Sequence, residues 1–229
     1  MVTGILANIN SRYSNNIGWN PGVDFSYRLN DYKLFFGINR SMRIPTFTDL
    51  YYQGPTNIGN PDLIPEESIS YDLGVEYTNS NFVLHSSIYH NRGRNIIDWV
   101  REIDSEKWQP MNHTKLNNSG IELSLEVKPI IRISNNTYLV HSLKASYSFN
   151  EMTKDSKEYI SKYVLDYMRH KASLSLTHKI TRDFYGSWIW IWQDRAGTYT
   201  KYDVEATEQE EVEYPLFSLL DFRIYWKHN

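Results

Sequence analysis

Histidine side chains are the first groups in this sequence whose spacing could support metal binding. The chain has seven histidines and no cysteine. His85 and His90 lie five residues apart in a predicted strand, so the alternation of side chains places them on opposite faces. His170 and His178 share a face but lie about 26 Å apart at about 3.3 Å per residue. Neither pair can share an ion, so we expect no metal site and no cofactor.

An acidic run near the C-terminal end offers carboxylates instead. Its members are Asp203, Glu205, Glu208, Glu210, Glu211 and Glu213. Carboxylate oxygens are the ligands that hard divalent cations prefer, which makes the run a candidate cation site, and a solvated acidic loop is the alternative. The sequence contains no glycine-rich phosphate loop, no serine-nucleophile motif and no zinc-peptidase motif. It therefore predicts no catalytic centre, and we expect a protein that is not an enzyme.

Aromatic side chains in predicted loops are the better candidates for ligand contact. They are Tyr51 and Tyr52, followed by Gln53, in one long loop, and Trp99 and Trp108 in the next. Exposed aromatic residues on loops that a rigid scaffold positions commonly bind ligands. Packing within the loops is the alternative for all five residues.

Aromatic residues are also frequent within predicted strands. They make up 15% of the chain, with 18 tyrosines against nine phenylalanines. Trp188, Trp190 and Trp192 share one strand face. Amphipathic rings of this kind form belts at membrane interfaces, and a platform for stacking bases or sugars is the alternative.

The elements that position these residues are alternating strands. Between residues 69 and 77, five apolar or aromatic residues alternate with Ser, Asp, Gly and Glu, a period of two that is typical of a strand. The pattern recurs and predicts about ten antiparallel strands, several longer than the five or six residues usual in globular sheets. Short turns at 30–31, 79–81 and 181–183 alternate with predicted connections at 43–67, 92–113, 150–165 and 193–213.

This rhythm is typical of an all-β, antiparallel transmembrane β-barrel, which has short turns at its periplasmic rim and long loops at its extracellular rim. No segment is long enough for a membrane-spanning helix and the mean hydropathy is −0.55, yet a barrel strand needs only about 9–11 residues, half of them polar. Lipid cannot solvate charges, so in a membrane the charged strand face must line the wet lumen. The charged strand residues are Glu76, Glu122, Glu126, Lys128, Asp221 and Arg223.

Three motifs occur in order around the first long loop. They are Arg43-x-Pro45-Thr46-Phe47-x-Asp49-Leu50-Tyr51, then Gly59-Asn60-Pro61-x-Leu63-x-Pro65-Glu66, then Tyr71-x-Leu73-Gly74. This ordered set resembles the mid-barrel signature of TonB-dependent outer-membrane receptors, the active-uptake transporters of Gram-negative bacteria. The motif residues are expected to be mainly structural: the prolines end strand pairing, the glycine permits a tight turn, and Glu66 begins the next strand.

The resemblance implies that residues 1–229 are part of the β-barrel of such a receptor, about ten strands of a larger barrel in the outer membrane. It implies import of a scarce nutrient, such as a ferric siderophore, haem or cobalamin, with energy supplied by TonB. The expected partners are outer-membrane lipid and the imported ligand, with TonB contacted only through an N-terminal plug region that these residues do not contain. A net charge of −3 gives no indication of a nucleic-acid partner. A passive porin-like or structural barrel and a soluble β-rich binding module are the alternatives.

Overall fold

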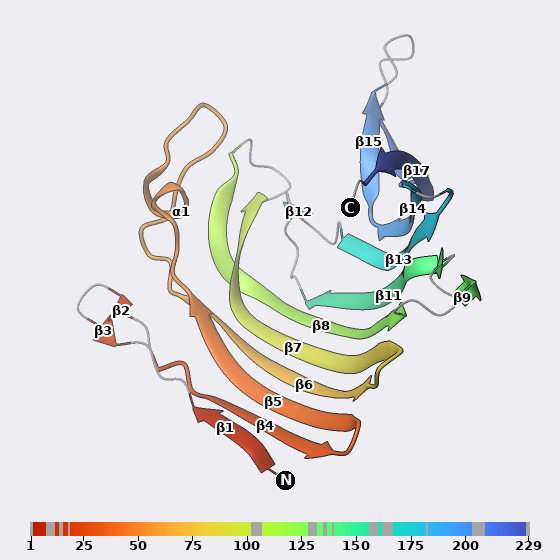
Figure 1. Cartoon of the computed structure of the whole chain (residues 1–229). Helices are drawn as coiled ribbons and strands as arrows, with labels where there is room; N and C mark the ends of the chain where they lie inside the picture. The colour runs from red at the N-terminus through yellow and green to blue at the C-terminus, as the bar shows by residue number, and fades with distance from the viewer. Residues whose placement is uncertain are drawn as a thin grey trace.

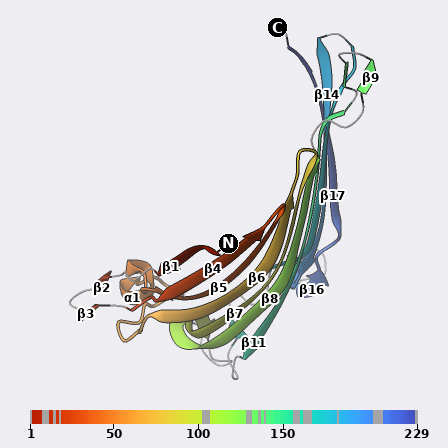
Figure 2. The same ribbon diagram turned by 60° about the horizontal axis from the view of Figure 1, so that its bottom comes forward.

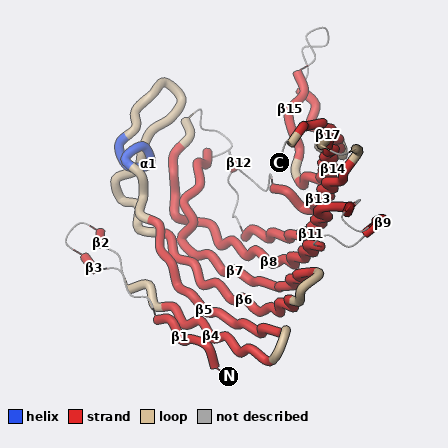
Figure 3. Tube along the Cα trace, in the orientation of Figure 1, coloured by secondary structure: helices blue, strands red, loops and turns tan. Residues whose placement is uncertain are grey.

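The computed structural model of the chain describes residues 2–7, 12–13, 16–17, 19–101, 107–127, 132–134, 137–138, 140–155, 160–161, 167–181, 183–202 and 209–227, to which the structural statements below refer. Nearly all of the regular structure is strand, and α1 is a short helix (Figure 3). The elements are β1 (Val2–Ala7), β2 (Arg12–Tyr13), β3 (Asn16–Ile17), β4 (Gly22–Leu29), β5 (Tyr32–Arg43), α1 (Phe47–Tyr51), β6 (Glu66–Thr78), β7 (Phe82–Arg101), β8 (Gln109–Val127), β9 (Arg132–Ser134), β10 (Thr137–Tyr138), β11 (Val140–Asp155), β12 (Ile160–Ser161), β13 (Tyr167–Lys179), β14 (Phe184–Ala196), β15 (Thr198–Tyr202), β16 (Gln209–Glu213) and β17 (Phe217–Trp226).

The long strands form one antiparallel sheet. Its order is β1-β4-β5-β6-β7-β8-β11-β13-β14-β17, and β12 pairs with the far end of β7. Figure 1 shows the sheet curved into a trough, and Figure 2 shows it from another side as a single layer. β1 and β17 are its two edges, so the sheet does not close. The predicted architecture, an antiparallel part of a barrel wall, is confirmed.

The short turns gather at one end of the sheet, and asparagines shape the turns between β4 and β5 and between β6 and β7. Asn30, in the turn between β4 and β5, has a φ of 52°, a left-handed conformation that asparagine tolerates. The Asn79 side-chain oxygen accepts hydrogen bonds from the backbone N–H groups of Asn81 at 2.8 Å and Phe82 at 2.9 Å. Local side-chain bonds of this kind replace the missing strand pairing at the turn between β6 and β7.

Three predicted connections are shorter in the structure. Residues 92–101 and 109–113 belong to β7 and β8, so the predicted connection over 92–113 is wrong for most of its length. β11 likewise continues to Asp155, and the hairpin of β15 and β16 occupies much of 193–213. These extensions are held by backbone pairing rather than by an alternating apolar face, which is why their sequence looked like loop.

A β-bulge lies at the point where the side chains of β7 that face the interior change from odd-numbered to even-numbered residues. The pairing register shifts between Gly93 and Ile96 and again at Ile97, and Asn95 has a φ of 53°. Below the bulge the odd-numbered Tyr89 lies on the concave face; above it the even-numbered Asp98 lies there, where it contacts Lys154 of β11. The bulge therefore reverses which side chains face the interior.

The two faces of the sheet differ in polarity. On the concave face the Tyr89 ring crosses Gly120, and its hydroxyl donates to Asn150 at 3.0 Å, two strands away. The convex face carries apolar side chains that remain exposed, such as Leu73 and Ile88. Among the described residues only Leu63, Val100 and Val127 are buried hydrophobics, so the sheet does not enclose a two-layer core. Its apolar face is of the kind that lipid covers. No described helix is long and apolar enough to cross a membrane.

Candidate functional site

The long connection between β5 and β6, residues 44–65, folds into a compact unit that we call the β5–β6 loop. Its helix α1 begins at a capping box: Thr46 accepts a hydrogen bond from the Asp49 backbone N–H at 3.1 Å, and the Asp49 carboxylate accepts from the Thr46 backbone N–H at 2.9 Å. Reciprocal bonds of this kind satisfy two amides that a helix start leaves open. The capping box thus fixes the residue at which this short helix begins.

An ion pair closes the base of the β5–β6 loop. Arg43, the last residue of β5, donates to the Glu66 carboxylate from Nε at 2.6 Å and from Nη2 at 2.5 Å. Glu66 begins β6 and also accepts the backbone N–H of Ile97 at 2.8 Å. A two-pronged arginine–carboxylate pair fixes both distance and orientation. The loop ends are therefore joined to each other and to β7.

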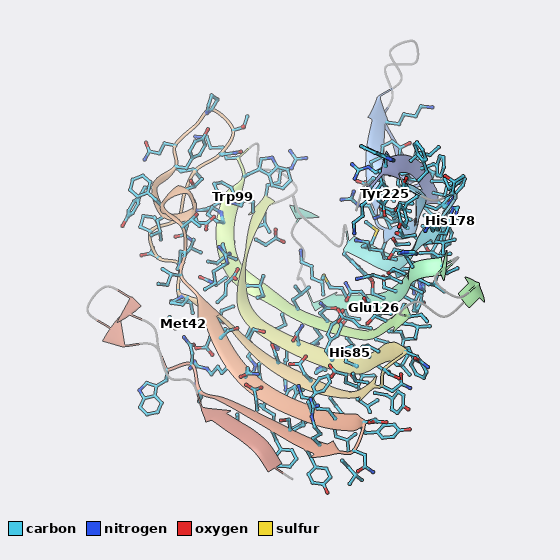
Figure 4. The ribbon with its side chains drawn as sticks, viewed as in Figure 1. Met42, His85, Trp99, Glu126, His178 and Tyr225 are labelled. Atoms are coloured by element: carbon cyan, nitrogen blue, oxygen red, sulfur yellow. The ribbon has the colours of Figure 1, made fainter. Side chains whose placement is uncertain are left out.

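Trp99 connects the helix to the extended part of β7. Its indole N–H donates to the Asp49 carboxylate at 3.3 Å, and Asp49 is buried, with 8% of its surface exposed. Burial raises the pKa of Asp49, but hydrogen bonds from Thr46 and Trp99 and the charge of Arg43 outweigh burial and hold this pKa below its ordinary value. Asp49 is thus held as the anion that its neighbours require. Figure 4 shows Trp99 beside the loop.

Two asparagines and a strand-like bridge attach the rest of the loop to β8. The Asn60 side chain donates to the Pro110 carbonyl at 3.1 Å. Asn112 accepts the Ile64 N–H and donates to the Ile64 carbonyl, both at 2.8 Å. The Ile58 N–H donates to the carbonyl of Trp108 at 2.9 Å. Because these bonds use backbone groups, they fix the path of the loop rather than a single side chain.

The motif residues lie within this packed unit. Pro45 and Leu63 are buried, Leu50 and Pro65 are half-buried, and Pro61 is exposed. A Cβ on Gly59 would lie 2.7 Å from Leu50 C and Tyr51 N, so the glycine permits a close approach of two backbone segments. These positions accord with the structural roles expected for the motifs.

The five residues predicted to contact ligand lie in or beside the β5–β6 loop, in two environments. Trp99 and Trp108 are half-buried; Trp99 binds Asp49, and the Arg101 guanidinium lies 5.2 Å from the Trp108 ring centre. This geometry favours the packing alternative for both tryptophans. Tyr51, Tyr52 and Gln53 are exposed, so for them ligand contact stays a prediction.

One exposed aromatic residue was missing from those candidates. Phe47 has 77% of its surface exposed, and its ring lies 5.1 Å from that of Tyr51, one helical turn away. The i, i+4 spacing of two aromatics after a capping threonine could have indicated the pair, had the sequence been read as a helix. Phe47 and Tyr51 form what we call the aromatic pair of α1.

A buried ion pair was also missed. Lys154 of β11 donates to Asp98 of β7 at 2.5 Å, and both side chains are more than nine-tenths buried. Their partnership depends on the bulge at Asn95, which brings Asp98 to the concave face. No local pattern in the sequence signals this contact.

The acidic run is divided by the structure. Glu210, Glu211 and Glu213 belong to β16, whereas Asp203, Glu205 and Glu208 lie outside the described residues. Within the part of the chain that the structure describes, no group of three His, Asp or Glu side chains could hold a metal ion. Cation binding by the whole run stays a prediction.

The three tryptophans of β14 lie on the apolar face. Trp188 packs on Phe222 with ring centres 4.1 Å apart, and its indole N–H donates to His178 at 3.0 Å. The Trp190 indole donates to Ser218 at 3.0 Å. From Trp188 to Trp192 the strand rises about 13 Å, and a belt of these rings at the membrane interface stays a prediction.

The comparison with protein families decides what this barrel wall belongs to. The family model described as TonB dependent receptor-like, beta-barrel matches residues 6–229. The chain belongs to the TonB-dependent receptors. This family resides in the outer membrane of Gram-negative bacteria, so lipid covers the apolar convex face.

Relatives of this receptor chain have several cargoes in their names. The vitamin B12 transporter BtuB of Vibrio vulnificus (strain YJ016) is 30% identical over 120 residues, which is 52% of this chain and 19% of that protein. The FrpB iron transporter of Neisseria meningitidis shares the fold at 14% identity with a TM-score of 0.66, over 93% of this chain and 32% of that one. The copper transporter OprC shares the fold at 17% identity with a TM-score of 0.64, over 93% of this chain and 32% of that one. The chain thus spans about a fifth of the curated relative's length and a third of the solved structures.

Proposed function

We propose that this chain forms barrel wall and ligand-binding loops of a receptor that imports a scarce nutrient across the outer membrane with energy supplied through TonB. The observation that carries the proposal is the β5–β6 loop, which is fixed to β7 and β8 and carries the exposed aromatic pair of α1. Exposed aromatic residues on a rigid loop supply contact area at a low cost in conformational entropy. The import of ligand, and not catalysis, is the proposed activity.

The proposed cargo is a large nutrient complex of the kind exemplified by cobalamin or a ferric siderophore. BtuB, the relative in sequence, is named for vitamin B12, and the two similar folds are named for iron and copper transport. Aromatic side chains contact the apolar surface of such ligands, while polar loop groups contact their periphery. TonB contact through a region outside these residues is part of the same proposal.

Uptake by cells that express the full-length protein tests the proposal. The probes are radiolabelled cyanocobalamin and a ferric catecholate siderophore, each measured with and without a functional TonB system. We expect accumulation of one probe that depends on TonB and saturates at low concentration. Accumulation that is equal without TonB and rises linearly with concentration would instead show a passive pore.

A further inference from the structure

Three basic side chains gather at the loop end of the convex face. They are Arg92 and Arg94 of β7 and Lys115 of β8, all exposed, and we call them the rim cations. They take no part in the β5–β6 loop contacts described above. Cations at this position need an explanation, because the same face carries the apolar side chains that lipid covers.

The pairing register places all three rim cations on the lipid-covered face. Arg92 lies opposite Ile69 of β6 and Asn117 of β8, and directly paired residues share a face. Ile69 is one of the exposed apolar residues. Arg94 lies two residues beyond Arg92 on β7, and Lys115 lies two residues from Asn117 on β8. Because side chains alternate along a strand, both face the same side as Arg92.

The side chains on this face change in a fixed order from the turn end to the loop end. On β8 the order is Leu125, Leu123, Ile121, Ser119, Asn117, Lys115, and on β7 it is Leu84, Ser86, Ile88, His90, Arg92, Arg94. On β8 apolar residues give way to small polar ones and then to a cation. On β7 a mainly apolar stretch, interrupted by Ser86, is followed by His90 and then by two arginines, the first of which lies opposite Asn117. This order follows the passage from hydrocarbon to headgroups in a bilayer.

The distances agree with that passage. From Phe82 to His90 the strand runs about 27 Å, or about 20 Å in height at a tilt near 40°, which nearly fills an apolar band of about 25 Å. At the end of this stretch the Tyr71 ring lies 6.3 Å from that of His90, whose Nδ1 contacts the Ser119 hydroxyl at 2.7 Å. Such amphipathic rings mark the interface, and the rim cations begin one alternate position beyond them.

Among the side chains that the structure describes, neither Arg92 nor Arg94 forms an ion pair with a carboxylate. Glu67, opposite Arg94, is bonded to Arg40 at 2.8 Å instead. Glu151 of β11, opposite Ser119, is bonded to Arg169 at 3.1 Å. Glu67 and Glu151 are thus engaged elsewhere, while Asp155 of β11 is the residue that pairs with Lys115. The two arginines therefore present positive charge to the headgroup layer, with Lys115 beside them.

We propose that the rim cations bind the phosphate groups of anionic lipids in the leaflet at the long-loop end of the barrel. Neighbouring strands lie about 5 Å apart and alternate residues about 7 Å apart, so two or three of the cations can reach one phosphate. Arginine guanidinium groups bind phosphate oxygens in two-pronged fashion, and lysine adds a point charge. This lipid site is independent of the nutrient that the receptor imports.

Lipid titration of the full-length protein in neutral detergent micelles tests the site. The probes are phosphatidic acid, phosphatidylcholine with the same acyl chains, and inorganic phosphate, with bound lipids counted by native mass spectrometry. We expect the wild type to prefer phosphatidic acid and the variant Arg92→Gln/Arg94→Gln/Lys115→Gln to lose this preference. The affinity for phosphatidic acid should fall about fivefold for each cation removed. The matched control is Lys33→Gln/Lys171→Gln/Arg223→Gln, which removes three cations from the lumen face. This control variant should keep the preference for phosphatidic acid.

The controls separate the possible explanations. Circular dichroism melts of both triple variants should match the wild type, since all six side chains are on the surface of the sheet. Retained preference in the rim variant, or equal loss in both variants, would overturn the proposal. Displacement of phosphatidic acid by inorganic phosphate at equal concentration would also overturn it, because the cluster would then bind a free anion rather than lipid.

Discussion

Glu66 and Arg43 form a two-pronged ion pair, with Nε–Oε2 at 2.6 Å and Nη2–Oε1 at 2.5 Å, across the base of the β5–β6 loop. The same carboxylate accepts the Ile97 N–H at 2.8 Å. One side chain therefore joins the end of β5, the start of β6 and the extension of β7. A loop held at its base in this way can present its outer residues in a fixed position.

Replacing Glu66 by Ala should expose the Ile97 amide to exchange with solvent. A hydrogen bond to a charged group contributes about 1.5–3 kcal/mol, so the exchange rate of that amide should rise at least about tenfold. Hydrogen exchange with site resolution measures it. Glu67→Ala is the matched control, because Glu67 pairs with Arg40 and not with Ile97. A similar rise in both variants would contradict the assignment.

The stability of the β5–β6 loop should depend on acid pH through Asp49. Its pKa is lower in the folded loop than in the unfolded chain, so its ionised form stabilises the loop above the ordinary aspartate range. This contribution is lost as the pH falls below about 3.9 and through the depressed pKa. Protection of the Asn60 amide, which donates to the Asp49 carbonyl at 2.8 Å, reports the loss. In Asp49→Asn the Asn60 amide should be less protected from exchange at neutral pH, and its protection should not fall further in acid. An unchanged acid transition in this variant would show that another group causes it.

Gly59→Ala should destabilise the loop by about 1–3 kcal/mol, the usual cost of overpacking. The added methyl would meet the backbone of Leu50 and Tyr51 at 2.7 Å, and backbone cannot turn aside. Gly54→Ala is the control, because there the methyl meets only the Tyr52 side chain, at 3.0–3.3 Å, which can rotate. Amide exchange across residues 46–60 compares the two. Equal effects would show that crowding at Gly59 is not the cause.

Leu123→Arg should cost about 2–4 kcal/mol of folding free energy in a bilayer, because it places a charge on the lipid-covered face. Ser124→Arg should cost little, since Ser124 lies opposite His85 and Ser146 on the lumen face. Denaturant titration of the protein folded into lipid vesicles gives both values. Matching penalties would refute the assignment of the two faces.

Removing the aromatic pair of α1 should weaken ligand binding without unfolding the loop. Phe47→Ala and Tyr51→Ala each remove an exposed ring, so stability should change by about 0.5 kcal/mol or less, while affinity should fall about 5- to 30-fold. Calorimetric titration of the full-length protein with whichever of cyanocobalamin or the ferric siderophore it imports measures the affinity. Ile64→Ala, with 51% of Ile64 exposed on the same loop, is the control. Unchanged affinity in both aromatic variants would exclude the pair from the ligand site.

The sequence predicted the membrane part of the fold best, because there lipid and lumen impose opposite demands on alternate residues. Leu73 and Asp72 illustrate this, since one is apolar and the other charged and the sheet places them on different faces. Beyond His90 neither face of β7 carries the row of apolar residues that hydrocarbon requires, so the alternation fades and the sequence resembles that of a loop. This is why its extension to Arg101 went unpredicted.

The candidate site was predictable only where its contacts are local. The capping pair Thr46 and Asp49 lies three residues apart and could be recognised from sequence alone. The contact between Asp49 and Trp99 spans fifty residues and depends on how β7 continues past its bulge. The sequence therefore could not separate the aromatic residues that pack, such as Trp99, from those that remain exposed, such as Tyr51.

The bulge at Asn95 determines which alternate residues of β7 face the interior in the part of the β7–β8 hairpin beyond it. Deleting that one residue would restore strict alternation in β7 and exchange the environments of Asp98 and Trp99, which would separate Lys154 from Asp98 and Asp49 from Trp99. The register shift of β8 between Thr114 and Asn112 is the matching change in the facing strand. Length changes in this hairpin are thus tolerable in steps of two residues, or in paired single steps, one on each strand.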